Sequence, residues 1–213
     1  MQLKNEVAEN VAKSLLQVKA VKLSPQDPFT WASGWKSPIY CDNRLTLSYP
    51  QIRTYIRQEF VKMIREEVGH IDIVVGVATG GIAIGALIAQ ELGLPFAYVR
   101  SSQKGHGLTN QVEGIVESGQ RAVVIEDLIS TGGSSMKAVE ALREIGCNVK
   151  ALIAIFNYGF KIAEDRFEKA KCRMISLSNY DALIEFALTS DYILKEDYNS
   201  LKKWREAPEK WKK

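Results

Sequence analysis

The fold of this chain is decided by one stretch of its sequence, Val123-Val124-Ile125-Glu126-Asp127-Leu128-Ile129-Ser130-Thr131-Gly132-Gly133-Ser134-Ser135. The stretch begins with apolar, β-branched residues, which are typical of a strand buried on both faces of a parallel sheet. Two acidic residues follow, and a turn of small residues then leads directly into a segment with helical periodicity. Because ligands bind beyond the carboxyl ends of the strands in an open parallel sheet, the stretch predicts a binding site as well as a strand.

The rest of the chain between residues 69 and 180 repeats this alternation of apolar runs and helix-length segments. Strands separated by helices in this way form βαβ units, whose sheets are mainly parallel. We therefore predict an α/β fold in which a twisted, mainly parallel, five-stranded sheet is flanked by helices. The five strands are expected at residues 71–77, 96–99, 122–125, 149–156 and 172–177.

The N-terminal third of the chain has a different pattern from this core. Apolar residues recur at helical spacing in residues 3–18 and again in residues 50–68, so each segment predicts an amphipathic helix. The residues between them, 21–48, combine prolines, aromatic residues and turn formers, which predicts short strands and loops that cover the core as a hood. We expect a single domain over residues 1–213, made of the N-terminal helix and hood elements (1–68), the parallel-sheet core (69–180) and a C-terminal helical segment (181–213).

Composition and charge exclude several classes of protein. The chain has 213 residues, of which 46% are hydrophobic and 25% charged, and its formal net charge is +3. This balance is typical of a globular protein, whereas a nucleic-acid-binding function would need a dense basic patch or a known binding module. No apolar run reaches the roughly 20 residues that cross a bilayer, and the first residues carry charges that a signal peptide would not tolerate. We expect a cytoplasmic protein that binds neither membranes nor nucleic acids.

The C-terminal run of residues 202–213 is basic and also contains Trp204 and Trp211. A basic tail of this kind could contact nucleic acid, but two large aromatic residues are more typical of a segment that docks on its own domain. We interpret the run as a solvated terminal helix with two docking aromatic side chains.

The small-residue turn in the deciding stretch has the features of a phosphate site. Residues 130–134 would present several backbone N–H groups and hydroxyls at the N-terminus of a helix, where a phosphate monoester binds favourably. Glu126 and Asp127 lie next to this turn and can accept hydrogen bonds from the vicinal hydroxyls of a ribose. A purely structural interpretation, in which the turn only caps the helix, explains one hydroxyl but not the two carboxylates. The residues therefore favour a site for ribose 5-phosphate.

This window resembles the signature with which the type I phosphoribosyltransferases bind phosphoribosyl pyrophosphate (PRPP). The shared order is an apolar run, two acidic residues, two apolar residues and a small loop rich in Thr and Gly, with Glu126 at a position where Asp is commoner. The resemblance implies the type I phosphoribosyltransferase fold. It also implies that PRPP is bound by Glu126, Asp127, Leu128, Ile129, Ser130, Thr131, Gly132, Gly133 and Ser134.

Two further segments resemble the orotate phosphoribosyltransferases in particular. One is similar to the N-terminal motif of that family and reads Phe29-Thr30-Trp31-Ala32-Ser33-Gly34-Trp35-Lys36-Ser37-Pro38-Ile39-Tyr40. The other is similar to its mobile catalytic loop and reads Arg100-Ser101-Ser102-Gln103-Lys104-Gly105-His106-Gly107. The resemblance implies that the chain transfers ribosyl 5-phosphate from PRPP to N1 of orotate, giving orotidine 5′-monophosphate and pyrophosphate in pyrimidine biosynthesis.

The segment of residues 101–119 is polar and rich in glycine and lacks apolar periodicity, so we interpret it as a mobile lid. By the same resemblance, Arg100, Lys104 and His106 are catalytic residues that close over the pyrophosphate of PRPP, in the neighbouring subunit's site of a homodimer. Cationic donors at that place stabilise the charge that gathers on the leaving pyrophosphate. Mg²⁺ is the expected cofactor, held mainly through PRPP and water and without a direct protein ligand. Taken alone, the segment is equally compatible with a solvated surface loop.

The residues expected to bind orotate are less clearly marked. Ser130 matches a family position whose hydroxyl meets the orotate. Lys36 and Tyr40, in the hood, are candidates for contact with orotate or PRPP, but a packed aromatic hood with a lysine extended to solvent explains both residues equally well.

The chain also departs from the family pattern at several cationic positions. Some members have lysines where this chain has Ala32, Gly80 and Ser101, and some have an arginine where it has residues 157–159. These differences imply a subfamily that holds orotate and pyrophosphate with fewer cations, and they leave open which group faces the orotate carboxylate.

Two alternative functions share the same PRPP site. The first is a phosphoribosyltransferase for another base, such as a purine, against which the order of Arg100, Lys104 and His106 argues. The second is a non-catalytic PRPP sensor that regulates transcription, which would need a nucleic-acid-binding module that the sequence does not show.

Overall fold

The computed structural model describes residues 2–31, 34–100 and 111–211, and it places a six-stranded sheet at the centre of the chain. The strand order is β10-β9-β8-β5-β6-β7. Neighbouring strands are parallel except for β6 and β7, which are antiparallel. The strands are β5 (Ile73–Val77), β6 (Phe96–Val99), β7 (Val112–Glu113), β8 (Arg121–Ile129), β9 (Asn148–Asn157) and β10 (Met174–Asn179).

The α/β fold and the mainly parallel sheet are confirmed, but the predicted number of five strands was wrong. The additional strand is β7, which pairs with the end of β6 through Tyr98 and Glu113 and forms one edge of the sheet. It lies within the segment that we interpreted as a lid. β7 has only two residues and its neighbours in the sequence are mostly polar, so the sequence contains no apolar run there from which a strand could be predicted.

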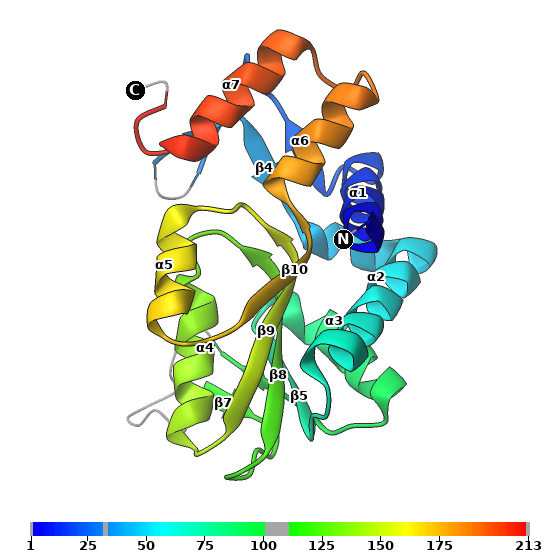
Figure 1. Ribbon diagram of the computed structural model, residues 1–213, viewed down its shortest axis with the longest axis vertical. Helices are drawn as coiled ribbons and strands as arrows, with labels where there is room; N and C mark the ends of the chain where they lie inside the picture. The colour runs from blue at the N-terminus through cyan, green and yellow to red at the C-terminus, as the bar shows by residue number, and fades with distance from the viewer. Residues whose placement is uncertain (1, 32–33, 101–110, 212–213) are drawn as a thin grey trace.

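Helices cover both faces of the sheet, as Figure 1 shows. The helices α1 (Gln2–Gln17), α2 (Pro50–Met63) and α3 (Gly80–Leu92) lie on one face, and α4 (Gly133–Glu144) and α5 (Lys161–Lys169) lie on the other. A single turn of π-helix, η2 (Ile64–Val68), continues α2. Residues along β8 alternate between two separate apolar cores, with Val123 and Ile125 in the first and Val124 in the second. This alternation explains the continuous apolar run in the sequence.

The hood consists of short strands, as predicted from residues 21–48. β1 (Val21–Leu23) pairs with β4 (Ile39–Cys41), and β2 (Phe29–Thr30) pairs with β3 (Lys36–Ser37), both antiparallel. A 3₁₀ helix, η1 (Asn43–Ser48), joins the hood to α2.

The C-terminal helices α6 (Tyr180–Thr189) and α7 (Lys195–Glu206) lie beside the hood at one end of the molecule (Figure 1). Trp204 is fully buried, and its ring Nε1 donates a hydrogen bond to the carbonyl oxygen of Lys36 at 3.3 Å. Its ring also contacts Trp31, Tyr158 and Phe160. The expectation of docking aromatic residues in the C-terminal run is thereby confirmed, although the helix ends at Glu206.

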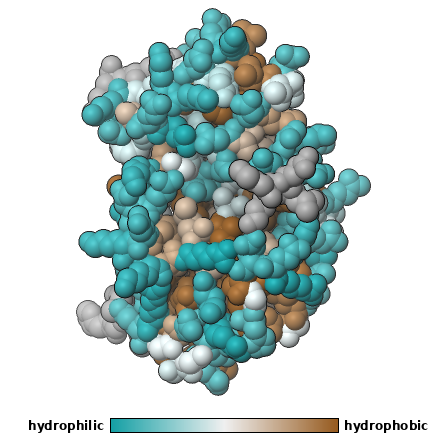
Figure 2. Space-filling view, viewed as in Figure 1, coloured by the Kyte–Doolittle hydropathy of each residue, from teal (hydrophilic) through white to brown (hydrophobic). Residues whose placement is uncertain are grey.

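The surface in the same view is dominated by hydrophilic residues, and hydrophobic ones appear as separate patches at the upper end and in the middle and lower parts of the view (Figure 2). Among the described helices, none is long and apolar enough to span a membrane.

Candidate active site

The acidic pair, Glu126 and Asp127, lies inside strand β8, in the part of the strand that pairs with β9 but no longer with β5. β8 pairs with β5 as far as Ile125 but continues along β9 to Ile129. The sequence predicted that the strand would end before the acidic pair, and the actual strand is four residues longer because β9 alone supports its last part. The two carboxylates are therefore held by a strand rather than by a turn.

The start of α3 closes against this part of β8. A Cβ atom added to Gly80 would lie 2.1 Å from the carboxyl carbon of Asp127, and one added to Gly81 would lie 2.2 Å from the carbonyl oxygen of Ile125. The helix can approach so closely only because these positions have no side chain. Asp127 is thus packed against α3, on the face of the sheet opposite to α4.

Glu126 is turned toward α4. Its carboxylate accepts a hydrogen bond from the Ser135 hydroxyl at 3.0 Å and another from the backbone N–H of Asp127 at 3.1 Å. Burial, together with the neighbouring charge of Asp127, raises the pKa of Glu126 to about 9. Burial also raises the pKa of Asp127 above its usual range. Within the described part of the chain no cationic side chain forms an ion pair with either carboxyl, so little offsets the cost of burying their charge, and the raised pKa values favour a proton on the pair near neutral pH.

The hood contacts this pair through a residue that the sequence analysis missed. Asn43 is buried, and its amide Nδ2 donates to the carbonyl oxygen of Asp127 at 2.7 Å. The amide oxygen in turn accepts from the Cys41 thiol at 3.1 Å, and burial raises the pKa of that thiol well above its usual range. An asparagine that follows a strand is typical of a turn, so nothing in the sequence pattern could have shown that Asn43 reaches β8.

The small-residue loop, residues 130–134, connects β8 to α4. Gly132 has a φ of 72°, in the left-handed region that glycine adopts without strain. Within the described residues, the backbone N–H groups of Thr131, Gly132, Gly133 and Ser134 donate to no other group of the chain. Such free donors at the start of a helix are what an anionic group requires.

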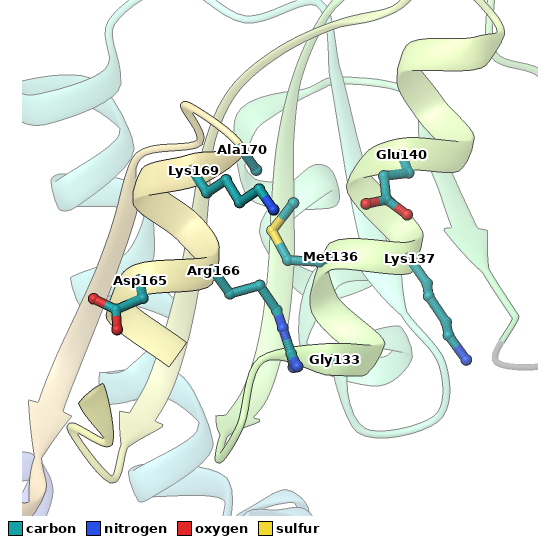
Figure 3. Close-up of a pocket in the computed structure, with 8 residues that line it drawn as sticks. All are labelled: Gly133, Met136, Lys137, Glu140, Asp165, Arg166, Lys169 and Ala170. Carbon is teal, nitrogen blue, oxygen red and sulfur yellow. The ribbon is translucent and has the colours of Figure 1, made fainter. Parts of the chain in front are cut away.

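An open groove of about 660 Å³ lies beside this loop, between α4 and α5. In Figure 3, the side chain of Arg166 extends from α5 toward Gly133, and Asp165 points away from it. Nη1 of Arg166 donates to the carbonyl oxygen of Thr131 at 2.7 Å. The sequence analysis also missed Arg166, because it is one of several charged residues on an amphipathic helix and belongs to no motif.

The structure brings one predicted lid residue to the loop. Arg100 directly follows β6, and it lines a small hollow of about 130 Å³ together with Ser134 and Lys137. Nη1 of Arg100 also lies 3.4 Å from the carboxylate of Glu113 in β7. Lys104 and His106 lie outside the described residues.

The hood candidates Lys36 and Tyr40 are placed on short strands. The ammonium group of Lys36 donates to the Thr30 hydroxyl at 2.9 Å. Tyr40 is 43% exposed, and its ring centroid lies 5.7 Å from that of Phe29. No contact joins either side chain to the acidic pair within the described part of the chain, so their role rests on the sequence resemblance.

A resident metal cluster is absent from the described residues, where no three His, Cys, Asp or Glu side chains are grouped to hold an ion. The carboxylates of Glu126 and Asp127 are the kind of oxygen ligand that Mg²⁺ accepts. Two carboxylates alone would leave most of the coordination sites of the ion to a substrate and water.

Comparison with known proteins identifies the class to which this fold and site belong. The pattern of the family described as phosphoribosyl transferase domain matches residues 49–191, which include the whole acidic pair and loop, so the chain belongs to that family. An orotate phosphoribosyltransferase of Porphyromonas gingivalis is 56% identical over 201 residues, which cover 94% of this chain and 96% of the relative. Within the family, the chain therefore belongs to the orotate phosphoribosyltransferases.

Solved structures agree with this placement. The crystal structure of an orotate phosphoribosyltransferase from Aeropyrum pernix superposes with a TM-score of 0.75 and 29% identity, over 86% of this chain and 99% of that one. A UMP synthase of Leishmania donovani gives a TM-score of 0.79 with 26% identity over 93% of this chain. This chain spans 42% of the length of that UMP synthase.

Proposed function

We propose that this chain is an orotate phosphoribosyltransferase, which transfers ribosyl 5-phosphate from PRPP to N1 of orotate in pyrimidine (UMP) biosynthesis. The products are orotidine 5′-monophosphate and pyrophosphate. The observation that carries the proposal is the match with curated orotate phosphoribosyltransferases at 50–56% identity over nearly the whole chain. The acidic pair, in which Glu126 is buried and Asp127 half-buried, lies beside free loop amides and supports the proposal, because a phosphorylated ribose needs acceptors for its hydroxyls and donors for its phosphate.

The substrate phosphate and ribose would bind at the end of β8. The 5′-phosphate accepts hydrogen bonds from the backbone N–H groups of the small-residue loop (130–134), and Ser130, Thr131 and Ser134 add hydroxyls. The ribose hydroxyls lie against Glu126 and Asp127. Leu128 and Ile129 connect these two parts of the site on the supported end of the strand. Ser130, at the start of the loop, also faces the orotate, and Lys36 and Tyr40 are further candidates for contact with it.

The chemical step breaks the bond between C1 of the ribose and the pyrophosphate oxygen and forms a bond from C1 to N1 of orotate, with inversion at C1. The bonding electrons leave with the pyrophosphate, whose oxygen takes up the proton that orotate N1 loses. Arg100, Lys104 and His106 would stabilise the leaving group from the lid, and Mg²⁺, when bound, would neutralise further charge on it. Rate acceleration then comes from charge stabilisation and positioning.

The assembly around this site is part of the proposal. Residues 1–213 act as one domain, because the hood is bonded to β8 by Asn43 and to α7 by Trp204. The enzyme works in the cytoplasm as a homodimer in which each lid serves the site of the neighbouring subunit. Completing the lid at a second subunit would exclude water, which otherwise captures the reactive ribosyl centre.

The direct test is the loss of orotate absorbance when the purified chain is mixed with orotate, PRPP and Mg²⁺. We expect a loss that requires all three components, each omission serving as its own control. Turnover with purine bases but not with orotate would replace the acceptor and leave the PRPP site in place. No turnover with any base, in a chain that still binds PRPP, would favour a regulatory sensor.

A further inference from the structure

The small-residue loop (130–134) rests on α5. A Cβ atom added to Gly132 would lie 2.9 Å from the ring of Phe167 and 3.7 Å from Cβ of Ala163. Both residues are buried members of α5. The helix therefore forms the floor of the loop beneath Gly132, so a ligand that contacts Gly132 must approach it from the other side.

Arg166, on the same helix, fixes the orientation of one peptide group in this loop. Its Nη1 donates to the carbonyl oxygen of Thr131 at 2.7 Å, so that carbonyl points toward α5. In a trans peptide the C=O and the following N–H point in opposite directions. The N–H of Gly132 is consequently directed away from α5, toward the open side of the loop, where it donates to no group of the described chain.

Arg166 also keeps its positive charge available. Among the described residues no carboxylate lies within 4.0 Å of its guanidinium group, and its neighbour Asp165 is paired with Lys161 at 2.5 Å. A guanidinium group has five N–H donors, and the bond to Thr131 uses one of them. In Figure 3 the group lies close to Gly133, the first residue of α4. A Cβ atom on Gly133 would be 3.2 Å from Nη1.

We infer that Arg166 is a positioning residue for the 5′-phosphate of the substrate. It holds the Thr131–Gly132 peptide with its N–H presented to the phosphate, and its charge adds to the positive potential of the α4 N-terminus. This inference rests on the proposed function for the identity of the phosphate. The effect is confined to the phosphate end of PRPP, because the lid residues act on the pyrophosphate at the other end.

The chain offers a matched control for this role. Arg143, on α4, donates to the carbonyl oxygens of Ala170 at 2.7 Å and Lys171 at 3.3 Å, at the far end of α5. Both arginines thus join α4 or its preceding loop to α5 through backbone carbonyls. Only the bond from Arg166 ends in the small-residue loop, so replacing each by methionine separates phosphate positioning from helix packing.

The experiment compares Arg166→Met, Arg166→Lys and Arg143→Met with the unaltered enzyme. The inhibition constants of ribose 5-phosphate and of pyrophosphate are measured in the orotate assay, and calorimetric titration with ribose 5-phosphate measures binding without turnover. For Arg166→Met we expect ribose 5-phosphate binding and the KM for PRPP to weaken about 10-fold, the loss of one charged hydrogen bond. The inhibition constant of pyrophosphate and kcat should stay within about 2-fold, because the substitution leaves the lid residues that act on the pyrophosphate unchanged.

The remaining variants decide between positioning and packing. Arg166→Lys restores part of the affinity, since lysine keeps the charge and one donor, and Arg143→Met binds both ligands normally. Equal weakening of ribose 5-phosphate and pyrophosphate, or an equal effect of Arg143→Met, would overturn the inference. The inference would also be overturned if Arg166→Met bound ribose 5-phosphate normally, or if the unaltered enzyme did not bind it at all. If the unaltered enzyme binds ribose 5-phosphate but does not consume orotate, the proposed acceptor is wrong. The calorimetric titrations of the variants then still decide the role of Arg166.

Discussion

Carboxylates lie near both ends of the strand β8, one from the residue before β5 and two from β8 itself, and the two ends differ in how the charges are balanced. At its beginning, Asp72 accepts three hydrogen bonds from Arg121, one from the backbone N–H and two from the guanidinium group, all at 2.8 Å. These bonds hold the pKa of Asp72 well below its usual range. At its other end, Glu126 and Asp127 have a hydroxyl, backbone groups and each other, and burial raises the pKa of both.

The difference is the one we expect between a structural carboxylate and the proposed ribose site. The charge of Asp72 is neutralised within the chain, so a further partner would gain little from it. The carboxyls of Glu126, which is buried, and Asp127, which is half-buried, are adjacent and lack an ion pair. Holding charge there costs folding free energy, which under the proposed function a substrate with hydroxyl donors and a cation would recover on binding. We expect changes at the second end to alter activity and pH dependence, and changes at the first end to alter neither strongly.

The largest effect is expected for Asp127→Asn, which removes one charge of the pair while keeping its shape. We predict a fall in kcat/KM for PRPP of about a thousand-fold, or ~4 kcal/mol, because the carboxylate stabilises the ribosyl group as positive charge develops on it. Steady-state kinetics with orotate provide the measurement. Asp72→Asn is the control at the other end of β8 and should retain normal turnover. If both variants lose activity equally, the contrast between the two ends fails.

The next effect concerns stability and pH. A carboxyl whose pKa is higher in the folded than in the unfolded chain contributes most stability below its unfolded pKa, and that contribution is lost as the pH rises. With the pKa of Glu126 raised to about 9, the free energy of unfolding should fall by about 3 kcal/mol between pH 5 and pH 7.

Glu126→Gln should remove most of this slope, because the amide has no proton to lose. Urea unfolding at pH 5, 6 and 7 measures it. Glu140→Gln, on the exposed face of α4, serves as the control and should follow the unaltered chain. A slope that persists in Glu126→Gln would show that the pair is ionised in the free protein.

A smaller effect is expected where α3 meets the functional half of β8. Gly81→Ala places a Cβ atom 2.2 Å from the Ile125 carbonyl oxygen, which is backbone and cannot rotate away. We predict a loss of about 2 kcal/mol in the free energy of unfolding, measured in urea at pH 7. Gly133→Ala is the control, since its nearest neighbour is the end of the long Arg166 side chain at 3.2 Å, which can shift by a few tenths of an ångström, and its stability should change by less than about 1 kcal/mol. Equal stability of the two variants would contradict the close approach.

The smallest effect is expected for Arg121→Met. The ion pair with Asp72 is partly exposed, so its loss should lower Tm by no more than about 2 °C at pH 7 and leave the KM for PRPP unchanged. The lowered pKa of Asp72 means that its contribution is present above the usual carboxyl range and is lost as the pH falls below about 4. Thermal unfolding at pH 7 and pH 3 should therefore show a smaller difference between variant and unaltered chain at the acid pH. A weakened PRPP affinity would mean that both ends of β8 serve the site.

Most of the fold could be predicted from the sequence because it depends on apolar periodicity. The five longer strands and their parallel arrangement follow from the runs that the two cores bury, whereas their order in the sheet does not. The strand β7 and the extension of β8 beyond Ile125 could not be predicted. They are held by hydrogen bonds to a neighbouring strand, through Val99 in one case and through Phe156 and Asn157 in the other. Such pairing leaves no trace in the periodicity of the residues that join it.

For the site, the sequence predicted the acidic pair and the small-residue loop because they are contiguous. Asn43 and Arg166 were missed because each reaches the site from a distant part of the chain, 84 residues from Asp127 in one case and 35 residues from Thr131 in the other. Asparagine is common in turns and arginine in helices, so only their positions in the fold show that these two side chains reach the site. The roles of Arg100, Lys104 and His106 stay predictions.

The bond from Trp204 to the carbonyl oxygen of Lys36 joins residues 168 positions apart and has a consequence for how the protein is made. During translation the hood strands leave the ribosome long before α7 does. Until α7 is synthesised, Trp31 and Tyr158 lack the ring of Trp204 that packs against both of them, and the carbonyl of Lys36 lacks its donor. A nascent chain can form its sheet from residues 73–179 while its hood is still incomplete. The helix α7 therefore completes the packing of a hood that is synthesised well before it.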